Sequence, residues 1–228
     1  MPGDITAYWT AYYDRVHHDG RPWLDYSNER VQAQSFALAL EAAGPVSGRR
    51  CLDVGSGQGQ FPKVLLALGA TRVTAVELVA ATVERCRAEA PAIDWRAGDA
   101  AAPASYEGLG TFEVVTALEV LQYVPFEATV GRLFSLVEPG GRLVGIVPNR
   151  ACPLVSRPIE RFEGRYGAAL AADVTRTLAA LPGVSQWTYR GLHFGKDQRV
   201  APYAPSAWTT ATDWAEAPNR FLFVATRP

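Results

Sequence analysis

The stretch at residues 52–61, LDVGSGQGQF, gathers residues whose types and spacing suit the binding of a nucleoside. Its glycines stand at every second position, Gly55, Gly57 and Gly59, and Asp53 precedes them. Glycines let a backbone adopt left-handed conformations and approach a ligand closely. A dinucleotide site would have the spacing G-x-G-x-x-G and hold a pyrophosphate. A carboxylate would repel that pyrophosphate, so the loop favours a ligand with positive charge nearby.

Two more acidic residues follow in positions that suit a nucleoside. Glu77 ends an apolar stretch eighteen residues beyond Gly59, where it can accept both hydroxyls of a ribose. Asp99 ends the next such stretch and can accept a hydrogen bond from an exocyclic amine such as that of adenine. Together they indicate a ligand with an adenine, a ribose and a cationic group but no phosphate. S-adenosylmethionine, with its ammonium and sulfonium groups, fits that description.

Alternating strands and helices must position these residues. Apolar runs predict strands at residues 50–55, 72–78, 93–99, 112–118, 184–191 and 220–228, with a turn and a further strand within 139–148. Periodic segments predict helices at residues 4–16, 27–43, 60–70, 80–90 and 127–137 and near 167–181. The stretch 191–218 is predicted to be a long loop. Strands that alternate with helices favour an α/β fold with a parallel sheet covered on both faces.

The composition of the 228 residues is that of one globular domain, with 48% hydrophobic and 20% charged residues. The formal net charge of -1 provides no bulk field to recruit nucleic acid or an anionic membrane. No apolar run approaches a membrane span, and the N-terminus does not resemble a secretory signal. The three cysteines are widely spaced, which favours buried thiols, and we expect a cytoplasmic protein that binds no metal.

The ordered set of motifs resembles the class I (Rossmann-like) S-adenosylmethionine-dependent methyltransferase family. LDVGSGQGQF is similar to the first motif of that family, VTAVEL to the second, RAGDAA to the third, and FEVVTALEVLQYVP and VEPGGRLVGIVPN to the next two. The likeness spans about residues 49–149 and returns in the last strand. It implies a doubly wound, seven-stranded, mostly parallel sheet of order 3-2-1-4-5-7-6 with an antiparallel last strand, N-terminal helices and a lid-like insertion.

The resemblance also implies a set of cofactor contacts. Asp53 and the glycine loop would hold the methionine end, Glu77 the ribose and Asp99 the adenine. The residues predicted to bind the cofactor are Asp53, Gly55, Ser56, Gly57, Gly59, Glu77, Leu78, Asp99, Ala100, Leu118, Glu119 and Tyr13. Simpler interpretations stay open, since an acidic residue after a strand can also cap a helix, form a turn or face solvent.

The segments outside the motifs are predicted to bind the acceptor. We expect a single domain with a helical cap at 1–48, a cofactor core at 49–149, a substrate-side insertion with late strands at 150–218 and a final strand at 219–228. Trp9, Tyr12, Tyr13 and Val16 share one helix face, which is either a lid or part of the core. From that face Tyr13 could donate a hydrogen bond to the methionine carboxylate, and Tyr26, beyond the helix, is a weaker candidate for the same role.

Candidate catalytic and substrate residues rest on weaker signals. His193 lies in the late loop, where an acceptor could bind, and His18 lies near the end of the first helix. Either could act as a general base, although for His18 a surface position is the simpler interpretation. Tyr123 and Arg157 are predicted to bind the acceptor. Arg157 belongs to an arginine-rich stretch that could bind an anionic acceptor group or could be a solvated face paired with glutamates.

These features predict methyl transfer from S-adenosylmethionine to a small-molecule acceptor, with S-adenosylhomocysteine as the product. The acceptor atom would be oxygen or nitrogen, in a biosynthetic reaction. The alternatives are a methyltransferase that acts on protein or nucleic acid and a non-catalytic S-adenosylmethionine-binding protein. The sequence ALEV after the fourth strand differs from the N-P-P-Y type of tetrapeptide expected for methylation of nucleobase amines. We expect a monomer or homodimer that contacts neither nucleic acid nor membrane.

Overall fold

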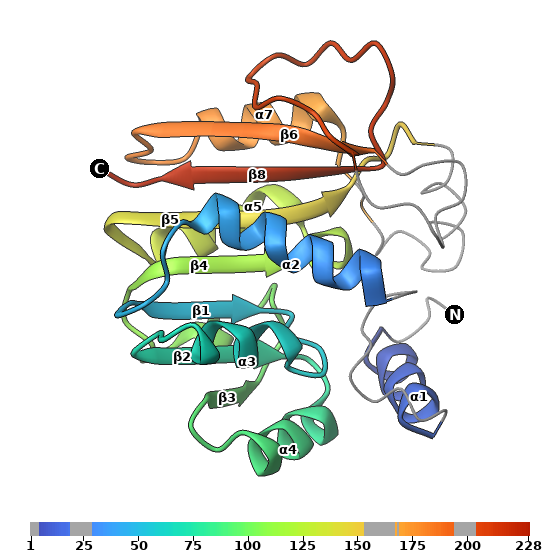
Figure 1. Cartoon of the computed structure of the whole chain (residues 1–228), viewed down its shortest axis with the longest axis vertical. Coiled ribbons are helices and arrows are strands. Elements are labelled where there is room, and N and C mark those ends of the chain that lie inside the picture. The colour runs from blue at the N-terminus through green and yellow to red at the C-terminus, as the bar shows by residue number, and fades with distance from the viewer. Residues whose placement is uncertain (1–4, 19–28, 153–166, 168, 194–203) are drawn as a thin grey trace.

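The fold is a single twisted sheet with helices on both faces, seen in a computed structural model (Figure 1). The structure describes residues 5–18, 29–152, 167, 169–193 and 204–228, with only the backbone for 16–18. The strands are β1 (Arg50–Val54), β2 (Arg72–Glu77), β3 (Asp94–Ala97), β4 (Phe112–Leu118), β5 (Val137–Pro148), β6 (Gln186–His193), β7 (Ala204–Pro205) and β8 (Arg220–Thr226).

The order of the strands is β3-β2-β1-β4-β5-β8-β6-β7. The first five strands are mutually parallel, whereas β8 runs antiparallel to both of its neighbours, β5 and β6. The predicted α/β fold and the order of its seven strands are therefore confirmed, with β8 as the seventh strand. The two-residue β7 is an eighth strand at the edge, inside the stretch that was predicted to be a loop.

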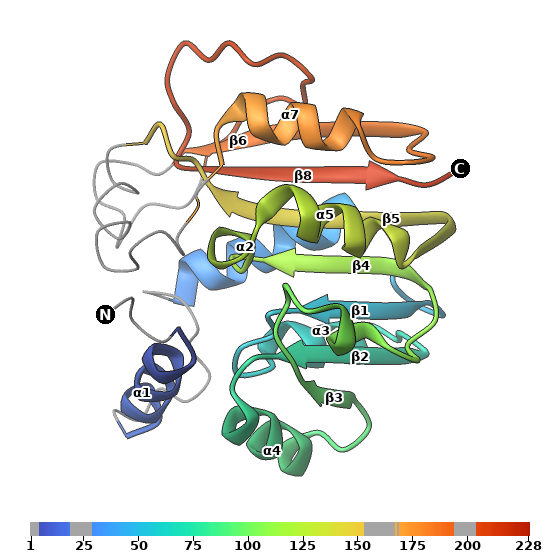
Figure 2. The ribbon, with the colours of Figure 1, turned by 180° about the vertical axis from the view of Figure 1, so that it is seen from behind.

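Helices cover both faces of this sheet (Figures 1 and 2). The α-helices are α1 (Ile5–His18), α2 (Glu29–Ala43), α3 (Gln60–Ala67), α4 (Ala80–Glu89), α5 (Phe126–Ser135) and α7 (Ala171–Ala179), and the short 3-10 helices are η1 (Pro103–Tyr106) and η2 (Leu121–Tyr123). Residues of α2, α3 and α4 pack in one core, and residues of α5 and α7 pack in the other. The helix α1 lies beyond the edge where the parallel strands end.

The central strands are buried on both faces, which explains why their sequences are continuously apolar. In β4 the adjacent side chains of Val114 and Val115 enter opposite cores, because successive side chains of a strand point to opposite faces. This arrangement leaves the strand ends as the places where polar groups can reach solvent or a ligand. Ligands bind at the carboxyl ends of such strands, where the order of the sheet reverses between β1 and β4.

The strand β5 begins earlier than the sequence predicts. Val137 already pairs with Phe112, although a turn was expected at the Pro-Gly-Gly sequence that follows. The register shifts before Val114 pairs with Arg142, and Gly140 has a φ of 80°. An irregularity of this kind accommodates extra residues in one strand. The Pro-Gly-Gly sequence therefore interrupts the regular pairing of β5 without ending the strand.

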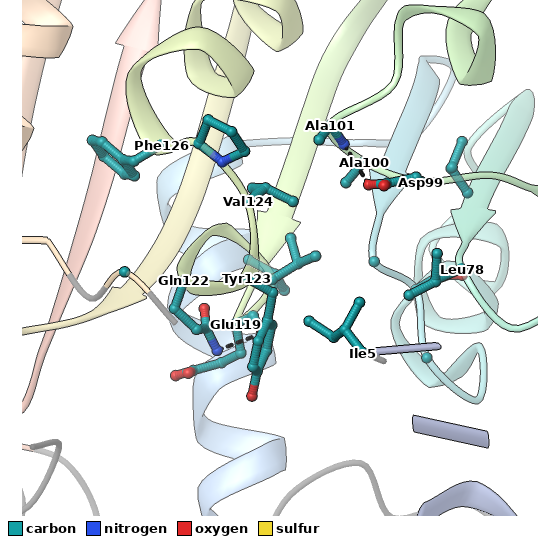
Figure 3. Close-up of a pocket in the computed structure, with 18 of the residues that line it drawn as sticks. Ile5, Leu78, Asp99, Ala100, Ala101, Glu119, Gln122, Tyr123, Val124 and Phe126 are labelled. Carbon is teal, nitrogen blue, oxygen red and sulfur yellow. Dashed lines mark hydrogen bonds between the residues drawn. The ribbon is translucent and has the colours of Figure 1, made fainter. Parts of the chain in front are cut away.

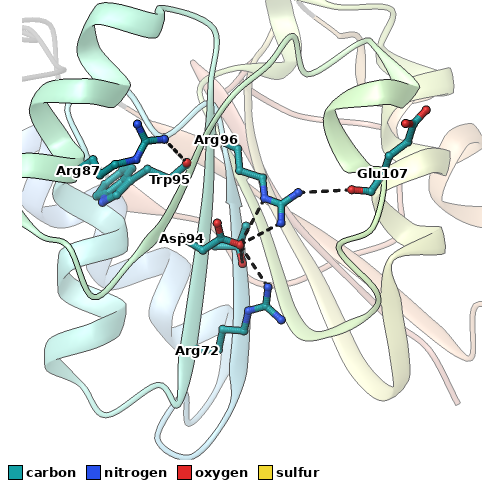
Figure 4. A network of polar contacts seen from close by, with 7 residues as sticks. Arg72, Arg87, Asp94, Trp95, Arg96 and Glu107 are labelled. Carbon is teal, nitrogen blue, oxygen red and sulfur yellow. Dashed lines mark hydrogen bonds and ion pairs between the residues drawn. The ribbon is translucent and has the colours of Figure 1, made fainter.

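The outer edge at β3 is fixed by a polar network (Figure 4). Asp94 accepts hydrogen bonds from Arg72 and Arg96, which lower the pKa of its carboxyl group although burial alone would raise it. The indole of Trp95 donates to the Ala90 carbonyl at 2.9 Å, and Arg87 donates to the Trp95 carbonyl at 2.7 Å. These bonds hold the Trp95 ring against the glycine loop.

Candidate active site

A cavity of about 900 Å³ lies at the carboxyl ends of the parallel strands. Its walls come from the end of β1 and the loop after it, the ends of β2 and β4, the turn after β3, the beginnings of α5 and β8, and the body of α7 (Figure 3). Residues of α1 also line it. The predicted cofactor-binding residues that line the cavity are Asp53, Gly55, Ser56, Gly57, Glu77, Leu78, Asp99, Ala100, Leu118, Glu119 and Tyr13.

Packing against neighbouring side chains, as well as the need to line the cavity, requires glycine in the glycine loop. Gly55, Gly57 and Gly59 all have a positive φ, which most other residues avoid. A Cβ on Gly55 would come within 2.5 Å of Val120, and a Cβ on Gly59 within 2.4 Å of Trp95. Gly59 does not line the cavity, so its position is explained by helix and strand packing rather than by the approach of a ligand.

The two acidic residues nearest the loop are buried and hydrogen-bonded. Asp53 is only 3% exposed, and its Oδ1 accepts a hydrogen bond from the Thr116 hydroxyl at 2.6 Å. Glu77 is 5% exposed and accepts the N–H groups of Gly57 and Val79, each at 3.0 Å. Burial raises the pKa of Glu77, and the backbone hydrogen bonds partly oppose that shift. Glu77 therefore holds the glycine loop against the end of β2.

The turn after β3 places Asp99 at the same edge of the sheet. Asp99 Oδ1 accepts the N–H of Ala101 at 2.8 Å, and the Tyr106 hydroxyl donates to the Ala100 carbonyl at 2.7 Å. Figure 3 shows Asp99, Ala100 and Ala101 together on one wall of the cavity. The turn is thus fixed by its own hydrogen bonds, and its side chains remain beside the cavity.

The opposite wall follows β4 and carries Glu119 and Tyr123. Glu119 forms an ion pair with Arg220, the first residue of β8, and Gln122 Nε2 donates to the Glu119 carbonyl at 2.7 Å. Burial raises the pKa of Glu119, whereas the Arg220 charge opposes the shift. The Tyr123 ring meets the Trp9 ring of α1 edge to face, with centroids 5.3 Å apart. This contact joins α1 to the cavity wall.

Some predicted residues are not brought to the cavity. His193 ends β6, with its ring 6.3 Å from that of Trp214, and it does not line the cavity. His18 ends α1, but its side chain lies outside the described part of the chain, as do Tyr26 and Arg157. The sequence analysis missed Gln122 and Arg220, which line the cavity. For Arg220 the only available signal was a single charge before an apolar strand.

Two further features concern the whole of the described chain. Within the ranges given above, no three His, Cys, Asp and Glu side chains are grouped so that they could hold a metal ion. None of the helices that the structure describes has both the length and the apolar character needed to cross a membrane.

A doubly wound sheet with acidic strand ends around a cavity at the carboxyl ends of its parallel strands defines a Rossmann-like α/β protein. The chain belongs to the methyltransferase domain family, which matches residues 27–193, and is a class I S-adenosylmethionine-dependent methyltransferase. The residues present fit that cofactor, because Asp53, Glu77 and Asp99 offer hydrogen-bond acceptors rather than a site for phosphate.

Among relatives, the chain is 36% identical over 185 residues to a ubiquinone biosynthesis O-methyltransferase of Bordetella bronchiseptica, covering 75% of each protein. It is 34% identical over 139 residues to the enzyme of that name from Albidiferax ferrireducens, covering 57% of this chain and 54% of the relative. The second match thus spans about half the length of the relative.

Solved structures share the fold. The N-methyltransferase NodS of Bradyrhizobium japonicum, bound to S-adenosylhomocysteine, superposes with a TM-score of 0.66 at 18% identity, covering 96% of this chain and 98% of NodS. Magnesium protoporphyrin IX methyltransferase from Synechocystis, also with bound S-adenosylhomocysteine, gives 0.61 at 17% identity, covering 97% and 98%. At these identities the likeness establishes the fold alone.

Proposed function

We propose that this methyltransferase methylates a hydroxyl oxygen of a small aromatic compound, as a biosynthetic step. One observation carries the proposal: a single cavity joins three acidic strand ends to a half lined by aromatic rings. Trp9, Tyr123 and Phe126 line that half and suit a flat acceptor ring. The names of the relatives support oxygen as the acceptor atom.

The residues of this chain have separate tasks in the proposed reaction. When bound, S-adenosylmethionine supplies a methyl group on a positively charged sulfur, which is a good leaving site. Asp53 and the glycine loop would hold the methionine end, Glu77 the ribose hydroxyls and Asp99 the adenine. Trp9 and Tyr13 of α1 line the cavity and would exclude water from it. Alignment of this kind supplies roughly 7–11 kcal/mol in favourable cases.

The same cavity supports a small molecule as the acceptor. We further infer that the protein binds no nucleic acid, lies in the cytoplasm and is a monomer or homodimer. The division of the chain into a cap, a cofactor core and a substrate-side insertion is part of this proposal. The described residues support a small acceptor because the aromatic half of the cavity includes rings from both α1 and η2.

The test is an incubation with S-adenosylmethionine and either catechol or aniline. Mass spectrometry should find a methyl ether of catechol and an equal amount of S-adenosylhomocysteine. The variant Asp53→Ala should bind no S-adenosylhomocysteine in calorimetry and give no product. Methylation of aniline alone would show that nitrogen is the acceptor. Cofactor binding without turnover on any acceptor, including cell extract, would favour the non-catalytic alternative.

A further inference from the structure

Glu119 is held in an unusual backbone conformation at the end of β4. Its φ is 58°, and it is the only non-glycine residue in the described part of the chain with a positive φ. A long side chain in the left-handed region costs about 1–2 kcal/mol, and such strain is often found at functional sites. The conformation is fixed by the Glu119 N–H, which donates to the Ile146 carbonyl at 2.9 Å, and by the bond from Gln122 to the Glu119 carbonyl.

The Glu119 carboxylate is directed away from Asp53, Glu77 and Asp99. Those three residues lie at or just beyond the ends of β1, β2 and β3, which form one side of the sheet. Glu119 instead pairs with Arg220, at the start of β8 and two strands away from β4 on the other side. In Figure 3 the Glu119 carboxylate likewise lies on the far side of the cavity from Asp99. Its carboxylate therefore belongs to the half of the cavity left for the acceptor.

A second hydrogen-bond acceptor is held by the backbone of Glu119 on the same wall of the cavity. The amide of Gln122 reaches the Glu119 carbonyl through its nitrogen, at 2.7 Å. The amide oxygen, Gln122 Oε1, is buried and has no hydrogen-bond partner among the described residues. A buried polar atom of this kind calls for an explanation. A ligand with two neighbouring hydroxyl groups would offer a donor to each acceptor.

Among the acidic side chains at this end of the cavity, that of Glu119 is the least exposed. The side chain of Glu119 is 15% exposed and that of Arg220 is 22% exposed. Arg150 after β5, Glu127 of α5, and Asp173 and Arg176 of α7 also line the cavity, and the last two pair with each other at 2.7 Å. Burial raises the pKa of Glu119, which brings a carboxylate closer to the basicity that proton transfer requires.

We propose that Glu119 is the proton acceptor for a vicinal diol on an aromatic ring, with Gln122 Oε1 binding the second hydroxyl. This inference rests on the proposed O-methylation and deepens it. The acceptor oxygen loses its proton to a Glu119 carboxylate oxygen while it forms the new bond to the methyl carbon. The carbon–sulfur bond breaks, and its electron pair stays on sulfur as a neutral thioether. Arg220 is a positioning residue that holds the carboxylate.

The kinetic test compares catechol with 4-nitrocatechol at mildly alkaline pH, where only the nitro compound is already ionised. A general base typically contributes 10²–10⁴-fold, so Glu119→Gln should slow the methylation of catechol by roughly 10²-fold or more. Methylation of 4-nitrocatechol should be nearly unchanged or faster, because its proton is already gone. Equal losses on both compounds, or no loss on either, would overturn the proposal.

A binding test does not depend on turnover. 4-Nitrocatechol is titrated into the complex with S-adenosylhomocysteine, and its absorbance reports which form is bound. The wild-type carboxylate should favour the neutral phenol over the phenolate, since it accepts a hydrogen bond from the first and repels the second. Glu119→Gln should reverse that preference, and an unchanged preference would contradict the assignment. Wild-type failure on every hydroxyl acceptor would instead count against the proposed function.

Two further variants control for folding. Glu107→Gln makes the same chemical change on an exposed side chain outside the cavity, beside the polar network of Figure 4, and should alter neither readout. Glu119→Asp keeps the carboxylate and suits the left-handed backbone, because aspartate tolerates positive φ. It should fold if Glu119→Gln does not and should retain the preference for the neutral phenol.

Discussion

Glu77 is a buried carboxylate that the fold already uses to hold its glycine loop. Its backbone partners include Gly57 of the glycine loop and Val79, just beyond the strand that Glu77 ends. Burial nevertheless dominates and raises its pKa above the ordinary value of 4.5. The free protein therefore binds a proton at Glu77 more tightly when folded than when unfolded. That difference makes the stability of the free protein dependent on pH.

We expect the free energy of unfolding to fall as pH rises from 4.5 through the raised pKa of folded Glu77. In that window the unfolded chain loses the proton first, so ionisation favours unfolding. Urea titrations across the window should show a shallower fall for Glu77→Gln than for wild type. Part of the slope should persist, because the pKa of Glu119 is raised in the same direction. Identical slopes in the two proteins would rule out this account, and Glu107→Gln serves as the control.

The sequence predicted the residues at the ends of consecutive strands better than those from distant segments. Asp53, Glu77 and Asp99 follow apolar runs, and parallel strands bring such positions to one edge. Arg220 was missed because its partner, Glu119, is 101 residues away in the chain. The left-handed backbone of Glu119 could not be predicted from the sequence either, since it depends on contacts with Ile146 and Gln122. The roles of all these residues, including the catalytic role suggested for His193, stay predictions.

At the scale of elements, the junction between the glycine loop, α3 and β3 depends on Gly59. Its φ of 78° lies in the region that most residues avoid, and the Trp95 ring occupies the space where a side chain would begin. Gly48 offers a comparison, since it has a φ of 77° and nothing within 4 Å of its missing Cβ. Comparing substitutions at Gly48 and Gly59 therefore separates the cost of a left-handed backbone from the cost of the clash with Trp95.

Gly48→Ala should lower the free energy of unfolding by about 1–2 kcal/mol, the cost of a left-handed residue. Gly59→Ala should lose that amount and roughly 1–3 kcal/mol more, because the Trp95 ring must move. Denaturant titrations of the two variants and wild type would measure the difference. If both variants lose the same stability, the Trp95 contact does not constrain the loop.

The sequence predicted most elements because their hydrophobic patterns are regular. The strand β4 has the predicted bounds, and α3 and α4 lie within the predicted ranges. The early start of β5 was missed because Pro-Gly-Gly usually marks a turn, and only pairing with Phe112 keeps the chain extended there. The strand β7 was missed because two residues carry no periodicity, and its pairing depends on β6.

At the scale of the whole molecule, cofactor binding should stabilise the fold. S-adenosylhomocysteine at about 100 times its Kd should add ~2.7 kcal/mol to the free energy of unfolding. For a domain of this size that corresponds to a rise in Tm of roughly 5–10 °C. Differential scanning fluorimetry should show the rise for wild type but not for Asp53→Ala. NAD at the same concentration should give no rise, because its pyrophosphate would meet the Asp53 carboxylate, and a rise with NAD would count against that electrostatic argument.

Because β8 lies between β5 and β6, β6 cannot join the sheet until β8, which is synthesised after it, has been made. On the ribosome the strands β1 to β5 can pair as they emerge, but β6 has no place in the sheet until β8 arrives. During that interval the side chains of Tyr189 and Leu192, fully buried in the finished protein, lack the strand β8 with which their residues pair. Arg220 arrives with β8, so a nascent chain can complete its nucleoside-binding half while Glu119 still lacks its cationic partner.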